Sequence, residues 1–263
     1  MNIVVCVKQV PDTWSEKKLD SGDSTLDRAA TDPVMNEMDE YAVEEALKIQ
    51  EAAGGEVTVL CMGPDAAAET VRKALSMGAD KAIHVLDDGL HGSDAVATSL
   101  VLAKALGTTE FDLVLLGSES SDARMSVIPA MLAERLGLPQ LTFAKEVTVD
   151  GASVKIKRMT DDGYQAVEAS LPAVVSVVEK INEPRYPSFK GIMAAKKKPV
   201  ATLSLSDLGV DAGEVGLGGA WSAVSSFESA PPRQAGTIVG AEGGNPDELA
   251  AKLADFLASK KFI

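Results

Sequence analysis

A short polar stretch follows the apolar run Leu113–Leu116 and precedes an expected helix. Its residues are Gly117, Ser118, Glu119, Ser120, Ser121 and Asp122. Main-chain amides that are exposed at the start of a helix bind phosphate well, because the helix dipole also favours negative charge there. The stretch therefore indicates a nucleotide phosphate site. Neither a Walker A sequence nor a GxGxxG sequence is present, so an ordinary strand-to-helix loop is the alternative.

Side chains of the kinds that catalyse reactions are few. His84 lies in the apolar run KAIHVL, which favours a structural role, whereas His91 lies in the polar loop DDGLHGSD and is expected to be exposed. The adjacent Asp87 and Asp88 are interpreted as a solvated turn. No GxSxG, HExxH or metal-ligand spacing occurs, so we expect no metal site. This inventory favours a binding or carrier protein over a self-sufficient enzyme.

Another notable stretch, Ile181–Lys198, combines aromatic, proline and basic residues. Pro184 and Pro187 argue against an ordinary helix or a central strand there. An aromatic tip beside three lysines suits docking to another protein, particularly in a chain whose formal net charge is −14. The alternative is that Phe189 packs on its own domain and that the lysines form a solvated face.

Apolar, β-branched runs alternate with helix-like stretches along the first half of the chain. The expected strands are Ile3–Val7, Val57–Cys61, Lys81–Val85 and Leu113–Leu116, and the expected helices are Asp39–Ala52, Ala66–Met77, Ser93–Leu106 and Ala123–Leu136. This alternation predicts an α/β fold with a doubly wound, mostly parallel sheet. Ligands of such folds bind at the carboxyl ends of strands, where Val5–Lys8, Met62-Gly63-Pro64 and Gly117–Ile128 are expected to converge.

The pattern changes after Pro139. Turn signals at Asp150-Gly151 and Asp161-Asp162-Gly163 join strand-like runs, and they predict an antiparallel hairpin addition to the sheet. From Pro199 the chain is interpreted as a long extension, with a Gly- and Ser-rich segment at Gly209–Ser226 that resists regular structure. Asn245, Pro246 and Glu248 then form a helix-start pattern, and Leu249, Leu253 and Phe256 make an apolar stripe.

Composition excludes several function classes. The chain has 263 residues, 46% of them hydrophobic, which is enough for a large α/β core. A net charge of −14 argues against nucleic acid and against an anionic membrane surface. Cys6 and Cys61 lie in strand-like runs and are interpreted as buried free thiols. Neither a signal peptide nor a membrane span is evident, so we expect a cytoplasmic protein without membrane insertion.

Six stretches resemble one family. VCVKQVPD, AVEEALKI, MGPDAAAETVRKALSMGADKAIHV, FDLVLLG, LPAVVSV and, above all, NEPRYPSFKGIMAAKKK occur in the order found in electron-transfer flavoprotein beta subunits. The sequence resembles these subunits over nearly its whole length. The resemblance implies a fold similar to that of the adenine nucleotide alpha-hydrolases.

The same resemblance implies a function in electron transport. The family's beta subunit forms a heterodimer with a larger alpha subunit, which holds most of the FAD, and it buries AMP in a structural role. Acyl-CoA and other dehydrogenases donate electrons, as in fatty acid beta-oxidation, and a membrane-bound quinone reductase accepts them. We therefore expect a nucleotide-binding domain at residues 1–199, and at 200–263 an arm whose terminal helix packs on the alpha subunit.

Alternatives remain open at this point. In electron-bifurcating relatives a second FAD occupies the AMP site. An adenine-nucleotide hydrolase or a stress-type nucleotide-binding protein would use the same fold, but a hydrolase needs a metal or an acid–base group near the phosphates, and none stands out. A purely structural subunit is the remaining reading.

The resemblance also implies nucleotide contacts. They map onto Cys6, Asn36, Glu37, Met38, Asp39, Met62 and the whole loop Gly117–Ile128, which continues after Asp122 with Ala123, Arg124, Met125, Ser126, Val127 and Ile128. The phosphate would meet the main-chain amides of the last three residues. Many members carry a hydroxyl side chain where this sequence has Ile128, so the identity of the nucleotide is open. Arg124 would compensate if its side chain points inward.

The family's partner-recognition loop corresponds to residues 177–199, with Phe189 at the hydrophobic anchor position. The other expected docking residues are Tyr186, Ile192, Met193, Lys196, Lys197 and Lys198. Relatives often have an acidic residue in place of Met159, which is thought to steer the flavin domain, and an aromatic residue in place of Thr13, near the flavin. Both departures leave these flavin-related contacts in question.

Overall fold

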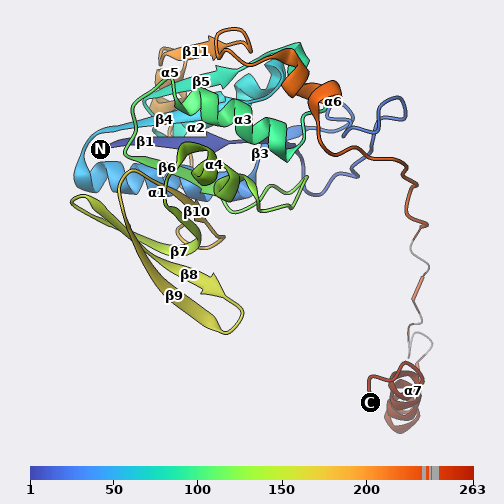
Figure 1. Cartoon of the computed structure of the whole chain (residues 1–263). Helices are drawn as coiled ribbons and strands as arrows, with labels where there is room; N and C mark the ends of the chain where they lie inside the picture. The colour runs from blue at the N-terminus through green and yellow to red at the C-terminus, as the bar shows by residue number, and fades with distance from the viewer. Residues whose placement is uncertain (233–234, 237, 239–242) are drawn as a thin grey trace. The chain divides into compact units, whose positions relative to one another are not determined.

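The computed structural model describes residues 1–232, 235–236, 238 and 243–263. These residues form two compact units, Met1–Ser225 and Ser226–Ile263. The first unit is built on a nine-stranded sheet with the strand order β11-β5-β4-β1-β6-β10-β7-β8-β9 (Figure 1). Its strands are β1 (Asn2–Val7), β4 (Glu56–Met62), β5 (Lys81–Val85), β6 (Leu113–Gly117), β7 (Gln140–Asp150), β8 (Ser153–Thr160), β9 (Gly163–Ser170), β10 (Ala173–Val177) and β11 (Val200–Leu203).

Neighbouring strands run parallel from β11 through to β7, and β8 and β9 continue the sheet in antiparallel pairing. The expected α/β fold, the mostly parallel sheet and the antiparallel addition are therefore confirmed. The structure adds a separate two-stranded antiparallel sheet, which the sequence pattern did not predict, made of β2 (Gln9–Pro11) and β3 (Pro33–Met35).

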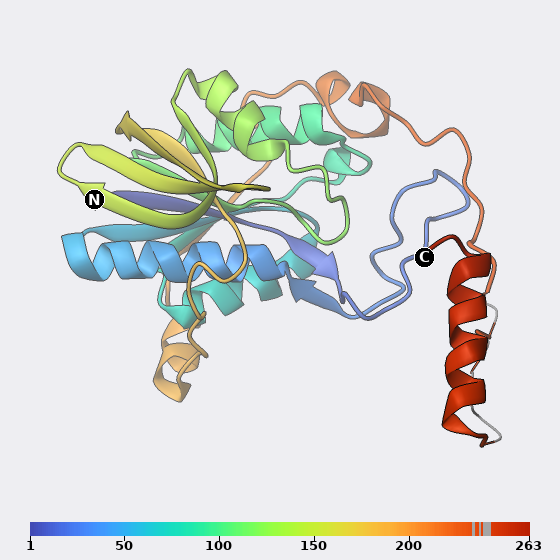
Figure 2. The ribbon, with the colours of Figure 1, turned by 90° about the horizontal axis from the view of Figure 1, so that it is seen from below.

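Helices cover both faces of the large sheet (Figures 1 and 2). They are α1 (Glu37–Ala53) and α2 (Ala68–Met77) on one face, and α3 (Ala95–Leu106) and α4 (Ile128–Leu136) on the other. The short helix α5 (Phe189–Ala195) packs on α2, and α6 (Gly216–Gly219) lies beside the 3₁₀ turns at Asp88–Leu90 and Ala212–Glu214; a further 3₁₀ turn spans Asp65–Ala67. Alternate residues of β1 point to opposite faces. Ile3 and Val5 join an apolar cluster with α1 and α2, whereas Val4 and Cys6 join a second cluster with α3 and α4.

Two expectations about element boundaries need correction. The helix expected from Ala123 begins at Ile128, because Arg124 and Ser126 have φ angles of 49° and 55°, outside the range of a right-handed helix. The extension expected from residue 200 begins with β11, which pairs in parallel with β5. The residues that follow also lie in the first unit, which ends at Ser225, and their buried apolar side chains are Leu205, Leu208, Val210 and Val215.

The second unit contains the helix α7 (Pro246–Ser259), whose start confirms the expected pattern. The Asn245 side chain accepts a hydrogen bond from the amide of Asp247, and Pro246 occupies the first turn. Within this unit Leu253 and Phe256 are 50% and 41% exposed, so the apolar stripe has little cover of its own. None of the helices in the described part of the chain has the length and apolar character needed to cross a membrane.

Candidate functional site

The strand order creates a switch point between β1 and β6. From β1 the chain proceeds to β4 and β5 on one side, and then crosses β1 to place β6 on the other side. In open α/β sheets such a reversal leaves a crevice at the carboxyl ends of the two central strands, where ligands bind. The residues at this edge are Lys8, which follows β1, and Gly117, which ends β6. The sequence prediction that these two strand ends converge is confirmed.

Asp39, in the first turn of α1, joins the two strand ends. Its carboxylate accepts hydrogen bonds from the amide of Lys8, at 2.8 Å, and from the amide of Gly117, at 3.2 Å. A Cβ atom at position 117 would lie 2.5 Å from a carboxylate oxygen of Asp39 and from the Cβ of Met38, so only glycine fits there. Burial raises the pKa of Asp39 to about 7, against the opposing effect of these hydrogen bonds.

Asn36, which precedes α1, holds the loop after β6. Its side-chain amide donates to the carbonyl oxygen of Glu119 at 2.9 Å, and its side-chain oxygen accepts the amide of Ser121 at 3.1 Å. The side chain is 1% exposed, so these bonds form away from solvent. The polar loop is therefore fixed by a buried side chain from a different part of the chain, and its conformation is set before any ligand binds.

Two cations meet the carboxylate of Asp122 in the same loop. The Lys8 ammonium lies 2.8 Å from one oxygen, and the Arg28 guanidinium lies 3.1 Å from the other. Burial by itself would raise the pKa of Asp122, but the attraction of Lys8 and the hydrogen bonds lower it below its usual value. Lys8 also donates to the hydroxyl of Ser120. The loop is thus tied to the end of β1 and to the segment between β2 and β3.

The far end of the loop presents main-chain groups. Ser126, Val127 and Ile128 lead into α4, and among the described residues no side chain caps this helix start. The backbone turns sharply there because Ser126 has a positive φ. Arg124 is exposed and forms no ion pair with any residue that the structure describes, so it does not supply the inward charge that the sequence left open.

Cys6 and Met62 lie at the same edge of the sheet, on the face that carries α3 and α4. Burial raises the pKa of the Cys6 thiol, and it raises that of Cys61 to about 12, so both thiols are protonated and are poor nucleophiles. His84 is buried, and its Nε2 atom lies 3.1 Å from the carbonyl oxygen of Gly63, as expected for a structural histidine. In the described ranges no group of three or more His, Cys, Asp or Glu side chains is arranged to hold a metal ion.

A phosphate group fits the chemistry of this edge. The uncapped start of α4 offers amides to a phosphate. The hydroxyls of Ser121 and Thr31 are buried, and neither has a hydrogen-bond partner within the part of the chain that the structure describes. Buried hydroxyls are rarely left unpaired, so the Ser121 hydroxyl, which belongs to this loop, is a candidate contact for a ligand. The other residues expected to contact the nucleotide lie in α1 or in the same loop: Glu37, Met38, Ser118, Ala123 and Met125.

A second candidate site lies on the segment after β10. Tyr186 and Phe189 are 96% and 81% exposed, and Ile192 and Met193 are about half exposed. These four residues are called the docking surface here. Phe189 does not sit on an extended loop, as the prolines suggested, but begins α5, whose first turn is capped by the side chain of Ser188. The docking role of these residues stays a prediction.

The three lysines after α5 differ from one another. Lys196 and Lys197 are exposed. Lys198 instead donates to the carbonyl oxygens of Leu75, Gly78 and Ala79, at the end of α2. The expected docking role of Lys198 is therefore replaced by a structural contact.

Some residues of these sites were missed by sequence reasoning. Arg28 lies in a polar stretch with no motif, and Arg185 has no periodic pattern around it. Both act through ion pairs with residues more than 90 positions away, as the separations of 94 for Arg28 and 141 for Arg185 show. Only the folded chain brings these partners together.

Comparison with known proteins gives consistent matches. The family model described as "Electron transfer flavoprotein domain" matches residues 23–208. The electron transfer flavoprotein subunit beta of Mycobacterium tuberculosis (strain ATCC 25618 / H37Rv) is 53% identical over 268 residues, covering 100% of this chain and 99% of that protein. The subunit beta of Thermoanaerobacterium thermosaccharolyticum is 38% identical over 264 residues and 100% of both chains. CarD, a subunit of the caffeyl-CoA reductase-Etf complex of Acetobacterium woodii, is 34% identical over 265 residues and 100% of both chains.

Proposed function

We propose a function for this chain from its family: it belongs to the electron transfer flavoprotein family and is a beta subunit. The chain pairs with an alpha subunit, which holds FAD, and binds AMP in a structural role at the switch point between β1 and β6. It has no catalytic residues of its own. Bound FAD supplies the redox chemistry of the heterodimer. The residues of this chain bind AMP and dock the partner proteins.

One observation carries the nucleotide part of the proposal. Asn36 and Asp39 fix a polar loop at the carboxyl ends of the two central strands, where the buried hydroxyl of Ser121 has no partner among the described residues. A loop that is held this firmly presents its amides to a phosphate without reorganisation, which favours binding. Among the described residues, the ionisable side chains of Lys8, Asp39 and Asp122 at this loop are engaged in hydrogen bonds or ion pairs within the chain, which favours a bound nucleotide that is not turned over.

We also propose the route of the electrons. Acyl-CoA and other dehydrogenases dock through the docking surface and reduce the flavin, and a membrane-bound quinone reductase reoxidises it. The exposed aromatic side chains support this proposal, because aromatic anchors dominate the energetics of many protein interfaces. The proposed compartment is the cytoplasm, since Cys6 and Cys61 are buried free thiols of the kind that a reducing environment maintains.

The nucleotide content of the native heterodimer tests the function. The purified complex is denatured, and the released nucleotides are separated and quantified. We expect one AMP and one FAD per heterodimer. Two FAD molecules would instead identify a bifurcating type, and the absence of any nucleotide besides the flavin of the alpha subunit would overturn the proposed site. Turnover of added ATP by the isolated chain would favour a hydrolase.

A substitution at Asn36 tests whether the loop after β6 forms the AMP site. Asn36→Leu removes both hydrogen bonds to the loop while keeping a side chain of similar size. We expect the heterodimer to purify with clearly substoichiometric AMP and with its FAD retained. Asn2→Leu makes the same chemical change at the exposed amino end of β1 and should keep full AMP content. Equal AMP in both variants would show that the loop does not form the site.

A further inference from the structure

The docking surface has little apolar support of its own. Of the residues in α5, only Ala195 is buried, and the larger side chains face outward. Gly191 lies against the carbonyl oxygen of Ser76 at the end of α2, so α5 packs closely on α2 through its small residues, while its large apolar side chains stay exposed. Because hydrophobic burial is what normally orders a segment, other contacts must hold these residues in place.

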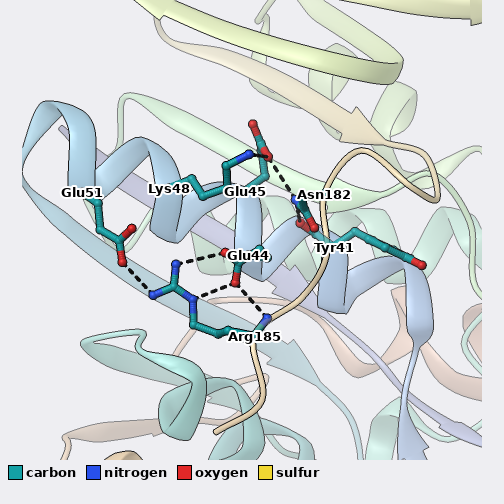
Figure 3. A network of polar contacts seen from close by, with 7 residues as sticks. All are labelled: Tyr41, Glu44, Glu45, Lys48, Glu51, Asn182 and Arg185. Atoms are coloured by element: carbon teal, nitrogen blue, oxygen red, sulfur yellow. Dashed lines mark hydrogen bonds and ion pairs between the residues drawn. The ribbon is translucent and has the colours of Figure 1, made fainter. Parts of the chain in front are cut away.

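Polar contacts with α1 provide that support (Figure 3). The Arg185 side chain forms a two-pronged pair with Glu44, in which its Nε atom donates to one carboxylate oxygen at 2.7 Å and a terminal nitrogen donates to the other at 3.0 Å. The backbone amide of Arg185 also donates to Glu44, at 3.1 Å. Both the side chain and the main chain at this position are thus fixed to a single carboxylate.

Two neighbouring contacts extend this clamp along α1. A further terminal nitrogen of Arg185 donates to Glu51 at 2.6 Å. The Asn182 side chain donates to the carbonyl oxygen of Tyr41 and to the carboxylate of Glu45, both at 3.0 Å. Hydrogen bonds with Glu44, and secondarily with Glu51, raise the pKa of the Arg185 guanidinium further above its ordinary value. The segment before Tyr186 is therefore held at two points, Asn182 and Arg185, which lie three positions apart.

The burial of the partners indicates what the clamp does. The Glu44 side chain is 8% exposed, and that of Arg185 is 34% exposed. A buried carboxylate that loses its cation is strongly destabilised, so the pair strongly favours this one arrangement. Pro184 and Pro187 flank the clamped residue and reduce the freedom of the backbone on either side.

We propose that Arg185 and Glu44 are positioning residues, which hold the docking surface in its partner-binding arrangement before the partner arrives. Partner affinity then depends on Glu44, although Glu44 is buried under Arg185 and is not available to contact the partner. This inference rests on the proposed docking function. It adds a mechanism to that function: because the clamp already orders the docking surface, binding of the partner does not have to supply the free energy of ordering it.

The charges beside the docking surface define the class of partner. Lys190, Lys196 and Lys197 are exposed on or beside α5, in a chain with a formal net charge of −14. The partner that fits is a protein with an apolar pocket bordered by acidic side chains, because such a pocket accepts the aromatic anchors and attracts the lysines. In the proposed function this partner is an acyl-CoA dehydrogenase.

Hydrogen–deuterium exchange on the complete heterodimer tests the positioning directly. Glu44→Gln keeps the size of the side chain and removes its charge. We expect faster exchange in residues 182–195 and little change in the central sheet. Glu40→Gln removes a carboxylate from the same helix, where Glu40 pairs with Lys73 of α2, and it should leave residues 182–195 unchanged. Unaltered exchange in Glu44→Gln would overturn the inference.

Kinetics with an acyl-CoA dehydrogenase from the same organism supply the functional readout. In Glu44→Gln the KM for the heterodimer is expected to rise about 2- to 10-fold, with kcat nearly unchanged, since only the cost of ordering the surface is added. Glu44→Gln and Arg185→Gln combined should be no worse than the more affected single variant, because both remove the same contact. Additive effects would show that Arg185 acts independently of Glu44, through Glu51 or through the partner, and would contradict the shared clamp.

Phe189→Ala distinguishes a failure of the positioning role from a failure of the proposed docking function. If Phe189→Ala raises KM and Glu44→Gln does not, the surface docks but the clamp does not position it, and the inference fails alone. If neither variant affects KM while wild-type electron transfer proceeds, the docking surface itself is wrong and both proposals fail. Thermal unfolding and AMP content, measured on every variant, show whether a loss arises from misfolding.

Discussion

A single buried carboxylate joins the two central strands of the sheet. Asp39 accepts the amide of Lys8 and the amide of Gly117, whose positions differ by 31 and 78 residues from its own. The two amides partly compensate the charge, yet burial dominates and raises the pKa of Asp39 to about 7. The group that organises the candidate nucleotide site therefore changes its protonation near neutral pH.

This pKa predicts a specific pH dependence of stability. The folded pKa is about 7 and the ordinary value is 3.8, so between these values the folded state binds more protons than the unfolded state. The contribution of Asp39 is greatest below pH 3.8 and is lost as the pH rises through 7. The free energy of unfolding of the wild type, relative to Asp39→Asn, should therefore fall with rising pH, by at most about 1.4 kcal/mol per pH unit.

Urea unfolding of both proteins at a series of pH values measures this difference. Asparagine at position 39 places an amide donor against a backbone N–H, so we expect a constant offset of about 1–3 kcal/mol as well. The slope, rather than the offset, carries the prediction. A difference that does not vary with pH across this window would show that Asp39 is ionised in the folded protein throughout.

The role of an individual residue could be predicted from the sequence only where the residue corresponds to a known contact of the family. The resemblance to the family pointed to Asn36 and Asp39 as nucleotide contacts, and the structure places both at the loop expected to hold the nucleotide. Their hydrogen bonds to main-chain groups were not predictable, because the partners Gly117 and Glu119 are distant in sequence and show no side-chain signal. Arg28 and Arg185 were missed for the same reason.

At the scale of elements, the end of α2 depends on a residue that follows α5. The last carbonyl groups of a helix have no partners within it and need donors from elsewhere. The ammonium of Lys198 supplies three hydrogen bonds, to Leu75 at 2.9 Å, Gly78 at 3.1 Å and Ala79 at 2.6 Å. A cation also interacts favourably with the negative end of the helix dipole. Lys198 thereby anchors the chain between α5 and β11.

Lys198→Met tests this contact. Methionine keeps an apolar stem and removes the ammonium, so three carbonyls lose their donor. We expect the free energy of unfolding to fall by about 1–3 kcal/mol, as is usual when buried polar groups lose a partner. The exposed Lys197→Met should change it by less than about 0.5 kcal/mol. Equal effects of the two substitutions in urea unfolding would contradict a capping role for Lys198.

Elements with strong local patterns were predicted best. β5 has the expected bounds, Lys81–Val85, because the run KAIHVL lies between the polar residues Asp80 and Asp87 and is too short for a helix. β11 was missed because its first three residues are exposed at the edge of the sheet, so they show neither alternation nor an unbroken apolar run. The start of α4 was placed too early, because nothing in the residue types of Arg124 and Ser126 signals positive φ.

For the whole molecule, the boundary between the two units lies later than the sequence suggested. The basic run and Pro199 resemble a linker, yet the chain returns to the sheet as β11 and places Leu205, Leu208 and Val210 in the core. The second unit begins at Ser226. The expected domain at residues 1–199 thus lacks β11 and the residues up to Ser225, which belong to the first unit. The arm, expected at residues 200–263, corresponds to the shorter second unit, Ser226–Ile263.

The exposed helix of the second unit leads to a prediction about the pairing of this chain with the alpha subunit. A helix that buries no residue within its own unit does not meet its ordering cost unless it packs on something else. We propose that Leu249, Leu253 and Phe256 of α7 pack on the alpha subunit. Deletion of the residues after Ala230 should therefore raise the dissociation constant of the heterodimer by about 100-fold or more, because burying even two of these three side chains contributes roughly 3 kcal/mol.

Sedimentation of the purified heterodimer over a dilution series measures this constant. Leu253→Asp combined with Phe256→Asp should reproduce the effect of the deletion, because it removes the apolar stripe and leaves the chain length unchanged. Lys252→Glu, which changes a charged residue next to the apolar stripe, should not weaken pairing by a comparable amount. The nucleotide content of the preparation and the unfolding midpoint of the first unit should be unchanged in every variant, since the first unit is compact without these residues. Pairing that is as tight in the truncated chain as in the wild type would show that α7 is not part of the subunit interface.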